Sequence, residues 1–138
     1  MILSINAGYL MEDVAKAAIG PIWFQHYMFK DRELTLSMIQ KAENLGYSAL
    51  CITLDTRGVR PKRERNLRNK YSSTPSPNLP DSILKERSKL ALEGSSLYDY
   101  SYGDPSANWT YLEWLVSKTS LPIVVKGIMT KEDAQLSL

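Results

Sequence analysis

Short apolar runs alternate with helical patterns along this chain, and that alternation limits the folds open to it. The apolar runs are "MILSIN", "IWFQHYMF", "YSALCITLD" and "IVVKGI", and a helical pattern follows each of them. Strands that alternate with helices predict parallel pairing through right-handed crossovers, because a parallel pair needs a long connection. A chain of 138 residues has room for one core. We therefore expect an α/β fold with a parallel sheet in a single domain, residues 1–138.

The second helical pattern carries the clearest boundary signals. Asp31 is placed to cap its first turn, and Gly46 is placed to end it. Between them the apolar side chains recur at helical spacing, at Leu34, Met38, Ile39, Ala42 and Leu45. Near the carboxyl end, Thr130 and Asp133 form a candidate capping box. These signals predict the limits of the second helix and the start of the last one.

An irregular stretch interrupts the alternation between 57 and 105. It contains "SSTPSPNLPDS" and "GSSLYDYSYGDPS", in which proline, serine and glycine favour turns over regular structure. Within it, "ILKERSKLALE" has the pattern of a short helix. Long loops after barrel strands are often functional, so we expect a partly mobile lid, with plain disorder as the alternative.

Charge and cysteine content argue against several classes of protein. Seventeen lysines and arginines against fifteen aspartates and glutamates give a net charge of +2, too balanced to indicate nucleic-acid binding. The basic run from Arg57 to Lys70 is the one feature in favour of an RNA-binding arm. The single cysteine, Cys51, lies in an apolar run and predicts a buried thiol, without a disulfide or a cysteine-based metal site. No apolar run approaches the ~20 residues of a membrane helix, and no secretory signal is present, so we expect an intracellular protein.

Polar side chains stand at the carboxyl ends of all four predicted strands. Alternation along the second strand puts Gln25 and Tyr27 on one side and His26 on the other. The remaining strands end in Ser4, in Thr53 followed by Asp55, and in Lys126. Taken singly, such a residue is usually a solvated strand end or a lysine that reaches water. In a parallel barrel, however, these ends meet at one mouth, so their coincidence predicts a ligand site.

Five segments follow one another in the order of the blocks of a known family. They are "ILSINAGYLMEDVA", "WFQHYMFKDRELT", "ALCITLDT", "KRERNLRNKY" and "LPIVVKGIMTKEDA". In them the chain resembles the FMN-dependent 2-hydroxyacid oxidases and dehydrogenases, which include glycolate oxidase, lactate oxidase and flavocytochrome b2. The resemblance implies a TIM-type (β/α)8 barrel, of which this chain covers about the second to the fifth strand. We therefore expect roughly half of such a barrel.

The resemblance also implies FMN as the cofactor and assigns its contacts. Ser4, Gln25, Thr53 and Lys126 match family positions that contact the isoalloxazine ring, with Lys126 near its N1 and O2 edge. Reduction places negative charge on that edge, and a fixed ammonium stabilises it. No residue is assigned as a metal ligand.

The reaction that the resemblance implies is oxidation of an L-2-hydroxy acid, such as lactate or glycolate, to the 2-oxo acid. Tyr27 matches a tyrosine that hydrogen-bonds the substrate, and Arg63 matches the arginine that binds its carboxylate, a task suited to a planar guanidinium. Asp55 matches the aspartate that orients the catalytic histidine and stabilises its charged form. Such an oxidoreductase would lie in the cytoplasm or, alternatively, in the peroxisome.

Two departures from the family pattern affect the substrate side. The stretch "TRGVRPKRE" stands where "TPxLGRRE" is common and carries one residue more, which leaves the substrate arginine open between Arg63 and its basic neighbours. Asn6 stands in place of an aromatic residue, which predicts an altered substrate pocket. The hydroxy acid and the electron acceptor therefore stay open.

The family's catalytic histidine and second substrate arginine lie in later blocks than this chain covers. Its only histidine, His26, faces away from Gln25 and Tyr27, and we expect it to be packed or exposed on the helical side. Half a barrel also leaves two open edge strands and an uncovered inner layer. We therefore expect the chain alone to be inactive, and either to form a homo-oligomer or aggregate, to pair with a missing half, or to fold unstably.

Two other functions stay open on the sequence alone. Lys126, at the end of a barrel strand, is placed as the Schiff-base lysine of a lyase or aldolase that acts on a carbonyl substrate. Alternatively, the chain is a non-catalytic truncated remnant or an assembly partner. Flavin absorbance would favour the oxidoreductase, and borohydride trapping on Lys126 without flavin would favour the aldolase.

Overall fold

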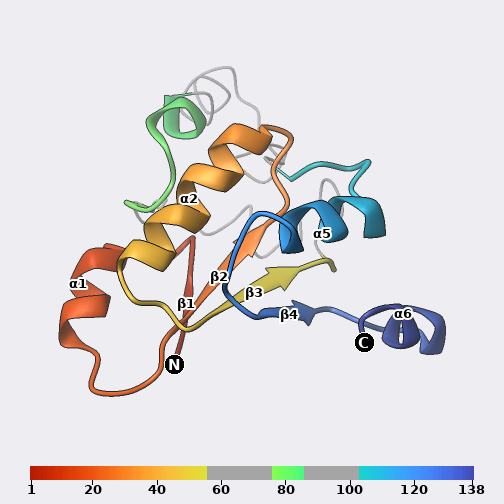
Figure 1. Ribbon diagram of the computed structural model, residues 1–138. Helices are drawn as coiled ribbons and strands as arrows, with labels where there is room; N and C mark the ends of the chain where they lie inside the picture. Colours follow the sequence, from red (N-terminus) through yellow and green to blue (C-terminus); the bar gives the residue numbers. More distant parts are fainter. Residues whose placement is uncertain (56–75, 86–102) are drawn as a thin grey trace, which may run out of the picture.

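Strands and helices alternate along the chain in the computed structural model, which describes residues 1–55, 76–85 and 103–138 (Figure 1). The strands are β1 (Ile2–Ser4), β2 (Trp23–Tyr27), β3 (Ala49–Thr53) and β4 (Ile123–Lys126). The helices are α1 (Met11–Ala17), α2 (Arg32–Asn44), α5 (Trp109–Val116) and α6 (Lys131–Leu136). The four predicted strand and helix units are therefore confirmed, with ends within a few residues of those expected.

The four strands form one parallel sheet in the order β1-β2-β3-β4. Each strand lies beside its successor in the sequence, which is the strand order of a (β/α)8 barrel. Figure 1 shows α2 and α5 over one face of this sheet, and α6 apart from them beyond the end of β4. No residue of α6 is buried. The described residues thus form an open sheet that is covered by helices on one face.

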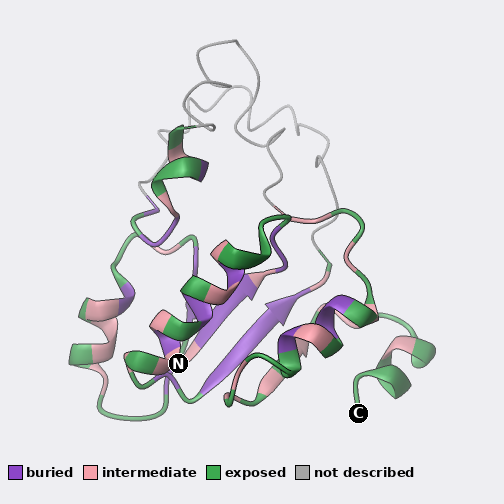
Figure 2. Cartoon of the chain, turned by 45° about the horizontal axis from the view of Figure 1, so that its top comes forward, coloured by how far each residue is buried: buried purple, intermediate pink, exposed green. Residues whose placement is uncertain are grey.

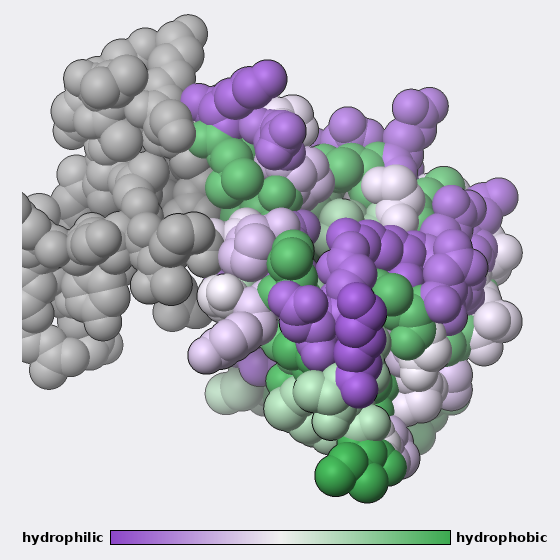
Figure 3. All heavy atoms as spheres, turned by 90° about the vertical axis from the view of Figure 1, so that its left-hand side faces the viewer, coloured by the Kyte–Doolittle hydropathy of each residue, from purple (hydrophilic) through white to green (hydrophobic). Residues whose placement is uncertain are grey.

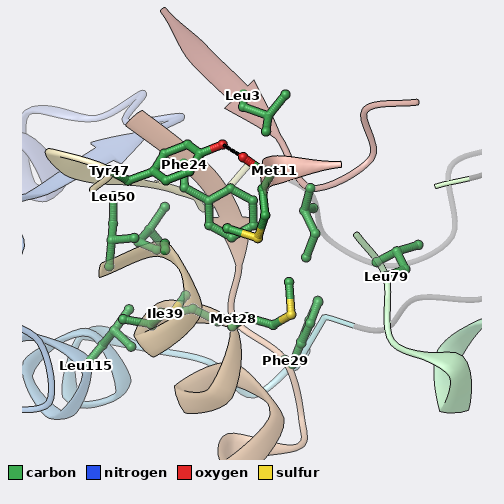
Figure 4. Packing of buried hydrophobic residues seen from close by; sticks show 14 of the residues in the cluster. Leu3, Met11, Phe24, Met28, Phe29, Ile39, Tyr47, Leu50, Leu79 and Leu115 are labelled. Atoms are coloured by element: carbon green, nitrogen blue, oxygen red, sulfur yellow. Dashed lines mark hydrogen bonds between the residues drawn. The ribbon is translucent and has the colours of Figure 1, made fainter. Parts of the chain in front are cut away.

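The hydrophobic core lies between the sheet and the helices that cover it. Alternate strand residues face this side, so Leu3, Phe24 and Leu50 pack against Ile39 of α2 and Leu115 of α5 (Figure 4). All five residues of β3 are buried, as its continuous apolar run predicted. In Figure 2 the buried residues gather on the strands and on the helix sides that face them.

The helix ends follow the capping signals of the sequence. The Asp31 carboxylate accepts a hydrogen bond from the backbone N–H of Leu34 at 3.0 Å, which confirms the predicted start of α2. Gly46 has a φ of +80°, the left-handed conformation expected just after a helix. The Thr130 hydroxyl accepts from the Asp133 N–H, but the Asp133 carboxylate accepts from that hydroxyl instead of from a backbone N–H. The last helix therefore has the predicted cap without the full reciprocal box.

Residues 76–85 belong to the core although they fall within the stretch expected to be irregular. Leu79 and Ile83 are buried in the main hydrophobic cluster, and residues 81–85 are helical. The helix expected over 83–93 is thus present at its start. The rest of that expected helix, and most of the expected lid, fall on 57–75 and 86–102, outside the described residues.

The α1 side of the molecule is a mixed polar and apolar surface. Figure 3 looks onto this side, where hydrophilic side chains gather across the middle of the face with hydrophobic groups around them. Lys41 of α2 and Glu12 of α1 form an ion pair of 2.7 Å, which ties these two helices together. None of the described helices is long and apolar enough to cross a membrane.

Candidate flavin-edge site

The register of the sheet brings the predicted polar residues to one edge. Ser4 lies opposite Gln25, and Tyr27 lies opposite Thr53. Thr53 in turn lies opposite Lys126. Gln25 lies two residues before the end of β2. Ser4, Tyr27, Thr53 and Lys126 are the last residues of their strands, so four neighbouring strands present polar side chains at their carboxyl ends. This is the edge at which parallel barrels carry ligands.

A hydrogen-bond chain links three of these side chains across three strands. Ser4 Oγ donates to Gln25 Oε1 at 2.8 Å, and Gln25 Nε2 donates to Thr53 Oγ1 at 2.9 Å. The same Gln25 amide nitrogen lies 3.2 Å from the carbonyl oxygen of His26. Gln25 and Thr53 are only 7% and 6% exposed. Burial makes an unpaired amide unfavourable, so this chain holds the Gln25 side chain in one orientation.

Lys126 and Asp55 form the charged part of the site. Lys126 Nζ lies 3.3 Å and 3.4 Å from the two carboxylate oxygens of Asp55. The next residue, Gly127, has a φ of +99°, and a Cβ built there would lie 2.7 Å from Asp55 Cβ. A glycine at this position is therefore what lets the β4 terminus pass close to Asp55. The partner that the structure shows for Asp55 is Lys126, so its expected role beside a histidine stays a prediction.

The loop that leaves β1 starts at the same edge. The Asn6 N–H donates to Ser4 Oγ at 3.2 Å, and the Ala7 N–H donates to the Ser4 carbonyl oxygen at 2.9 Å. Tyr27, which is half-buried, shares the sheet face of Gln25 and Thr53. Arg63, the expected carboxylate ligand, lies outside the described residues.

His26 belongs to the core and not to this edge. Its ring is fully buried, with centroids 4.4 Å from the ring of Phe29 and 5.8 Å from that of Phe24. Neither ring nitrogen has a hydrogen-bond partner among the described residues. Burial lowers the pKa of His26 to about 4, so the imidazole is neutral at pH 7. The expectation that this histidine faces away from Gln25 and is packed is confirmed.

Cys51 lies on the Gln25 face of the sheet, directly opposite Gln25 in the β2–β3 register. It is buried, as its apolar surroundings predicted, and burial raises the pKa of its thiol. A raised thiol pKa disfavours the nucleophilic thiolate, so Cys51 contributes packing beneath the polar edge. Within 1–55, 76–85 and 103–138, no three His, Cys, Asp or Glu side chains come close enough to hold a metal ion.

Comparison with models of known protein families shows which family the chain that carries this edge belongs to. The model of the FMN-dependent dehydrogenases matches residues 1–138, the whole sequence. The chain belongs to this family. The (β/α)8 barrel that the family resemblance implied is the architecture of its structural neighbours, and the parallel sheet described above is part of such a barrel.

Individual members of the FMN-dependent dehydrogenase family align over nearly the whole chain. A 2-hydroxyacid oxidase of Dictyostelium discoideum is 41% identical over 144 residues, which cover 100% of this chain and 35% of the relative. A peroxisomal (S)-2-hydroxy-acid oxidase of Oryza sativa subsp. japonica is 36% identical over 98% of this chain and 37% of the relative. The flavin-binding domain of baker's yeast flavocytochrome b2 superposes with a TM-score of 0.69 at 27% identity, covering 98% of this chain and 30% of that one. The chain thus spans little more than a third of the curated relatives it matches.

The edge fits the polar rim of a flavin ring in its hydrogen-bonding chemistry. That rim alternates carbonyl oxygens and ring nitrogens, so it needs several donors and at least one acceptor. Gln25 Oε1 keeps a second lone pair as an acceptor, the Thr53 hydroxyl can donate because it accepts from Gln25, and Lys126 adds N–H donors and a positive charge. Gly127 is a member of this edge that the assignment of polar residues left out, although a glycine directly after a strand-ending lysine was a visible signal.

Proposed function

We propose that this chain forms the flavin-edge part of an FMN-dependent oxidoreductase that converts an L-2-hydroxy acid to its 2-oxo acid. The observation that carries the proposal is the Ser4–Gln25–Thr53 hydrogen-bond chain at the carboxyl ends of adjacent parallel strands, with Lys126 next in register. Such a prearranged row needs little reorganisation when a planar polar ligand binds. The hydroxyacid oxidase relatives supply the reaction class.

Bound FMN would accept the two electrons that leave the substrate. The role of Lys126 is to hold positive charge where negative charge develops on the flavin. The role of Gln25 is to fix the ring by its carboxamide, which Ser4 and Thr53 already orient.

Tyr27 and Asp55 are the residues that we assign to the substrate side. Tyr27 would hydrogen-bond the substrate, and Asp55 would hold and charge-stabilise a histidine acting as base, as a triad aspartate does. Arg63 would bind the substrate carboxylate with its planar guanidinium. Asp55 pairs with Lys126 in this structure, so a histidine held by Asp55 would share this carboxylate with the Lys126 ammonium.

β1 and β4 are the outer strands of the described sheet. We propose that the open β1 and β4 edges are covered either by a second copy of this chain or by the missing half of the barrel, since unpaired parallel edges promote association. The location that follows is the cytoplasm or, as for the rice relative, the peroxisome. A fluorescent fusion expressed in cells separates these two locations.

FMN titration of the purified 138-residue chain tests the cofactor assignment. We expect FMN fluorescence to be quenched on binding, and we expect Gln25→Leu and Lys126→Met to weaken the binding at least about tenfold, as the loss of charged or buried hydrogen bonds predicts. Ser37→Ala on the exposed face of α2 is the control and should bind as the parent does. Absence of any saturable FMN binding, alone or mixed with the complementary barrel half, would refute the proposal.

A Schiff-base aldolase is the alternative that the same lysine suggests. The Asp55 carboxylate lies 3.3 Å from Lys126 Nζ, so a carbonyl compound would have to displace this carboxylate before it could react with the amine. The ion pair therefore favours the flavin assignment. Borohydride trapping of a carbonyl compound on Lys126 in flavin-free protein would reverse this preference.

A further inference from the structure

Helix α1 begins without a cap of its own. Its N-cap residue is Leu10, which has no side-chain oxygen, and no side-chain cap hydrogen bond forms there. Met11, the first helical residue, is completely buried, so an unpaired N–H at this point would be unfavourable. The backbone donor of Met11 therefore needs a partner from elsewhere in the chain.

Asn78 supplies that partner from a position 67 residues later. Its Oδ1 accepts a hydrogen bond from the Met11 N–H at 2.9 Å, and its Nδ2 donates to the Tyr9 carbonyl oxygen at 2.8 Å. Both polar atoms of the carboxamide are thus used on the same turn of backbone. Asn78 itself is buried, which strengthens both bonds and limits the side chain to one orientation.

The segment that carries Asn78 is anchored independently of these two bonds. Leu79 and Ile83 are buried in the main hydrophobic cluster, and the Leu79 N–H donates to the Ser76 carbonyl oxygen at 2.9 Å. Figure 4 shows Leu79 extending toward the cluster that contains Met11 and Phe29. Asn78 is therefore a fixed point against which the loop between β1 and α1 is held.

That loop joins the flavin-edge site at its other end. The Ile5 N–H donates to the Gln25 carbonyl oxygen at 3.0 Å, and the Asn6 N–H donates to Ser4 Oγ at 3.2 Å. Between these bonds and Tyr9, the loop carries exposed side chains along the carboxyl end of β1. The loop is thus clamped at one end by the site and at the other end by Asn78.

We propose that Asn78 is a positioning residue for the site, because it fixes the path of the β1–α1 loop and so the place of Asn6 beside Ser4. The inference rests on the proposed function for the statement that this edge binds FMN. Its structural part, that Asn78 orders residues 6–10, stands on the two hydrogen bonds alone. Asn78 does not touch the row from Ser4 to Thr53, and its effect on ligand binding is indirect.

The test separates positioning of the loop from capping of the helix. Asn78→Ala removes both bonds, and Leu10→Ser in the same chain restores a local N-cap without restoring the bond to Tyr9. Tyr47→Phe is the matched control. The Tyr47 hydroxyl donates to the carbonyl oxygen of the same residue, Met11, at 3.1 Å, and this bond does not involve residues 6–10 of the loop. The three readouts are the melting temperature, amide hydrogen exchange of residues 6–10, and the FMN dissociation constant.

We expect Asn78→Ala to lower the melting temperature and to speed amide exchange across residues 6–10 about tenfold, the change that losing a buried hydrogen bond predicts. Adding Leu10→Ser should recover part of the melting temperature, because a serine N-cap bonds the N–H of the second or third helical residue and leaves the Met11 N–H unpaired. The loop exchange should stay fast and the FMN affinity reduced. Tyr47→Phe should lower the melting temperature with loop exchange unchanged. Full recovery of all three readouts in the double variant, or unchanged loop exchange in Asn78→Ala, would overturn the inference.

The two proposals fail in different ways. If the parent chain and its complemented form never bind FMN, the proposed function fails, and exchange of residues 6–10 alone decides whether Asn78 orders the loop. If FMN binds and Asn78→Ala leaves both the loop exchange and the FMN affinity unchanged, the inference fails and the proposed function stands.

Discussion

Lys126 and Asp55 meet across the β3–β4 edge, with Nζ 3.3 Å from Oδ1 and with side chains that are 53% and 42% exposed. An ion pair this open to solvent contributes about 0–1 kcal/mol to folding, because water screens it and both side chains lose freedom. Stability therefore does not explain why a lysine ends β4 at this point. A charge held at the mouth of a ligand site, by contrast, acts on whatever ligand enters.

Lys126→Met should therefore weaken FMN binding and leave the stability of the fold nearly unchanged. We expect the free energy of unfolding in urea to change by less than about 1 kcal/mol and FMN affinity to fall at least about tenfold. Lys41→Met is the control, since Lys41 also pairs with a carboxylate, that of Glu12, but on the helical side. A Lys126→Met protein that binds FMN as tightly as the Lys41→Met protein would show that this ammonium does not contact the cofactor.

Gly20, Gly46 and Gly127 differ in φ and in the space around them, and together they allow a graded test of the turn at the end of β4. A Cβ at Gly20 would meet nothing within 4 Å, and the same holds at Gly46, where φ is +80°. At Gly127 the φ of +99° combines with a Cβ contact of 2.7 Å to Asp55 Cβ. We expect replacement by alanine to be nearly neutral at Gly20, to destabilise by about 1 kcal/mol at Gly46, and to destabilise most at Gly127.

Urea unfolding of the three alanine variants measures this order. Gly127→Ala should also displace Asp55 from Lys126, because the added methyl group occupies the space of the Asp55 side chain. Equal losses at Gly46 and Gly127 would mean that backbone conformation alone matters there and that Asp55 moves away freely.

Gln25 should be the most sensitive polar residue of the edge. Gln25→Leu leaves the hydroxyls of Ser4 and Thr53 without their shared partner, so we expect a loss of about 1–3 kcal/mol in unfolding free energy. Thr53→Val removes only one bond of the chain and should cost less. A double-mutant cycle between the two should give a coupling energy of about 0.5–3 kcal/mol. Strictly additive effects would show that the hydrogen bond between them is absent in solution.

The strands and the side chains at their ends could be predicted because they depend on local periodicity. Side chains along a strand alternate between two faces whatever the rest of the fold does, so Gln25 and His26 were assigned opposite sides correctly. The caps at Asp31 and Thr130 could be predicted for the same reason, because each capping side chain bonds a backbone N–H only three residues further along the chain. Parallel order then followed from the alternation of elements.

Contacts between distant segments could not be predicted in the same way. Leu10 gives no capping signal, and nothing in the local sequence of α1 points to Asn78 as the residue that completes its first turn. The pairing of Asp55 with Lys126 depends on the backbone path through Gly127, which only the folded sheet defines. The roles of the site residues toward FMN and substrate stay predictions that ligand binding must test.

The sheet face opposite the helices should make the isolated chain associate. Ile2 on β1 and Val124 on β4 lie on that face and are 51% and 37% exposed, and β1 and β4 end the described sheet. Exposed apolar side chains beside open strand edges favour pairing. We expect light scattering coupled to size exclusion to show dimers or larger species, and Val124→Lys to shift them toward monomer. Ile19→Lys, at a fully exposed residue between α1 and β2, is the control; a cooperative monomer for the parent chain would contradict the prediction.

His26 is the only histidine of the chain, and it should make the free energy of unfolding depend on pH. Burial lowers its pKa from 6.5 to about 4 in the folded chain, so the folded state binds a proton less readily than the unfolded state. The stability due to the neutral ring is therefore complete above pH about 6.5 and is lost as pH falls toward about 4, a change of about 3 kcal/mol for this shift.

His26→Leu isolates this contribution. It removes two ring nitrogens that have no hydrogen-bond partner among the described residues and keeps an apolar side chain between Phe24 and Phe29. We expect the variant to be at least as stable as the parent near neutral pH, because no polar group is left buried without a partner. Between pH about 6.5 and about 4 its unfolding free energy should fall less than that of the parent, by about 3 kcal/mol. Parallel pH profiles for the two proteins in urea unfolding would mean that His26 is hydrated or protonated inside the folded chain, and that the core around it opens more readily than its packing implies.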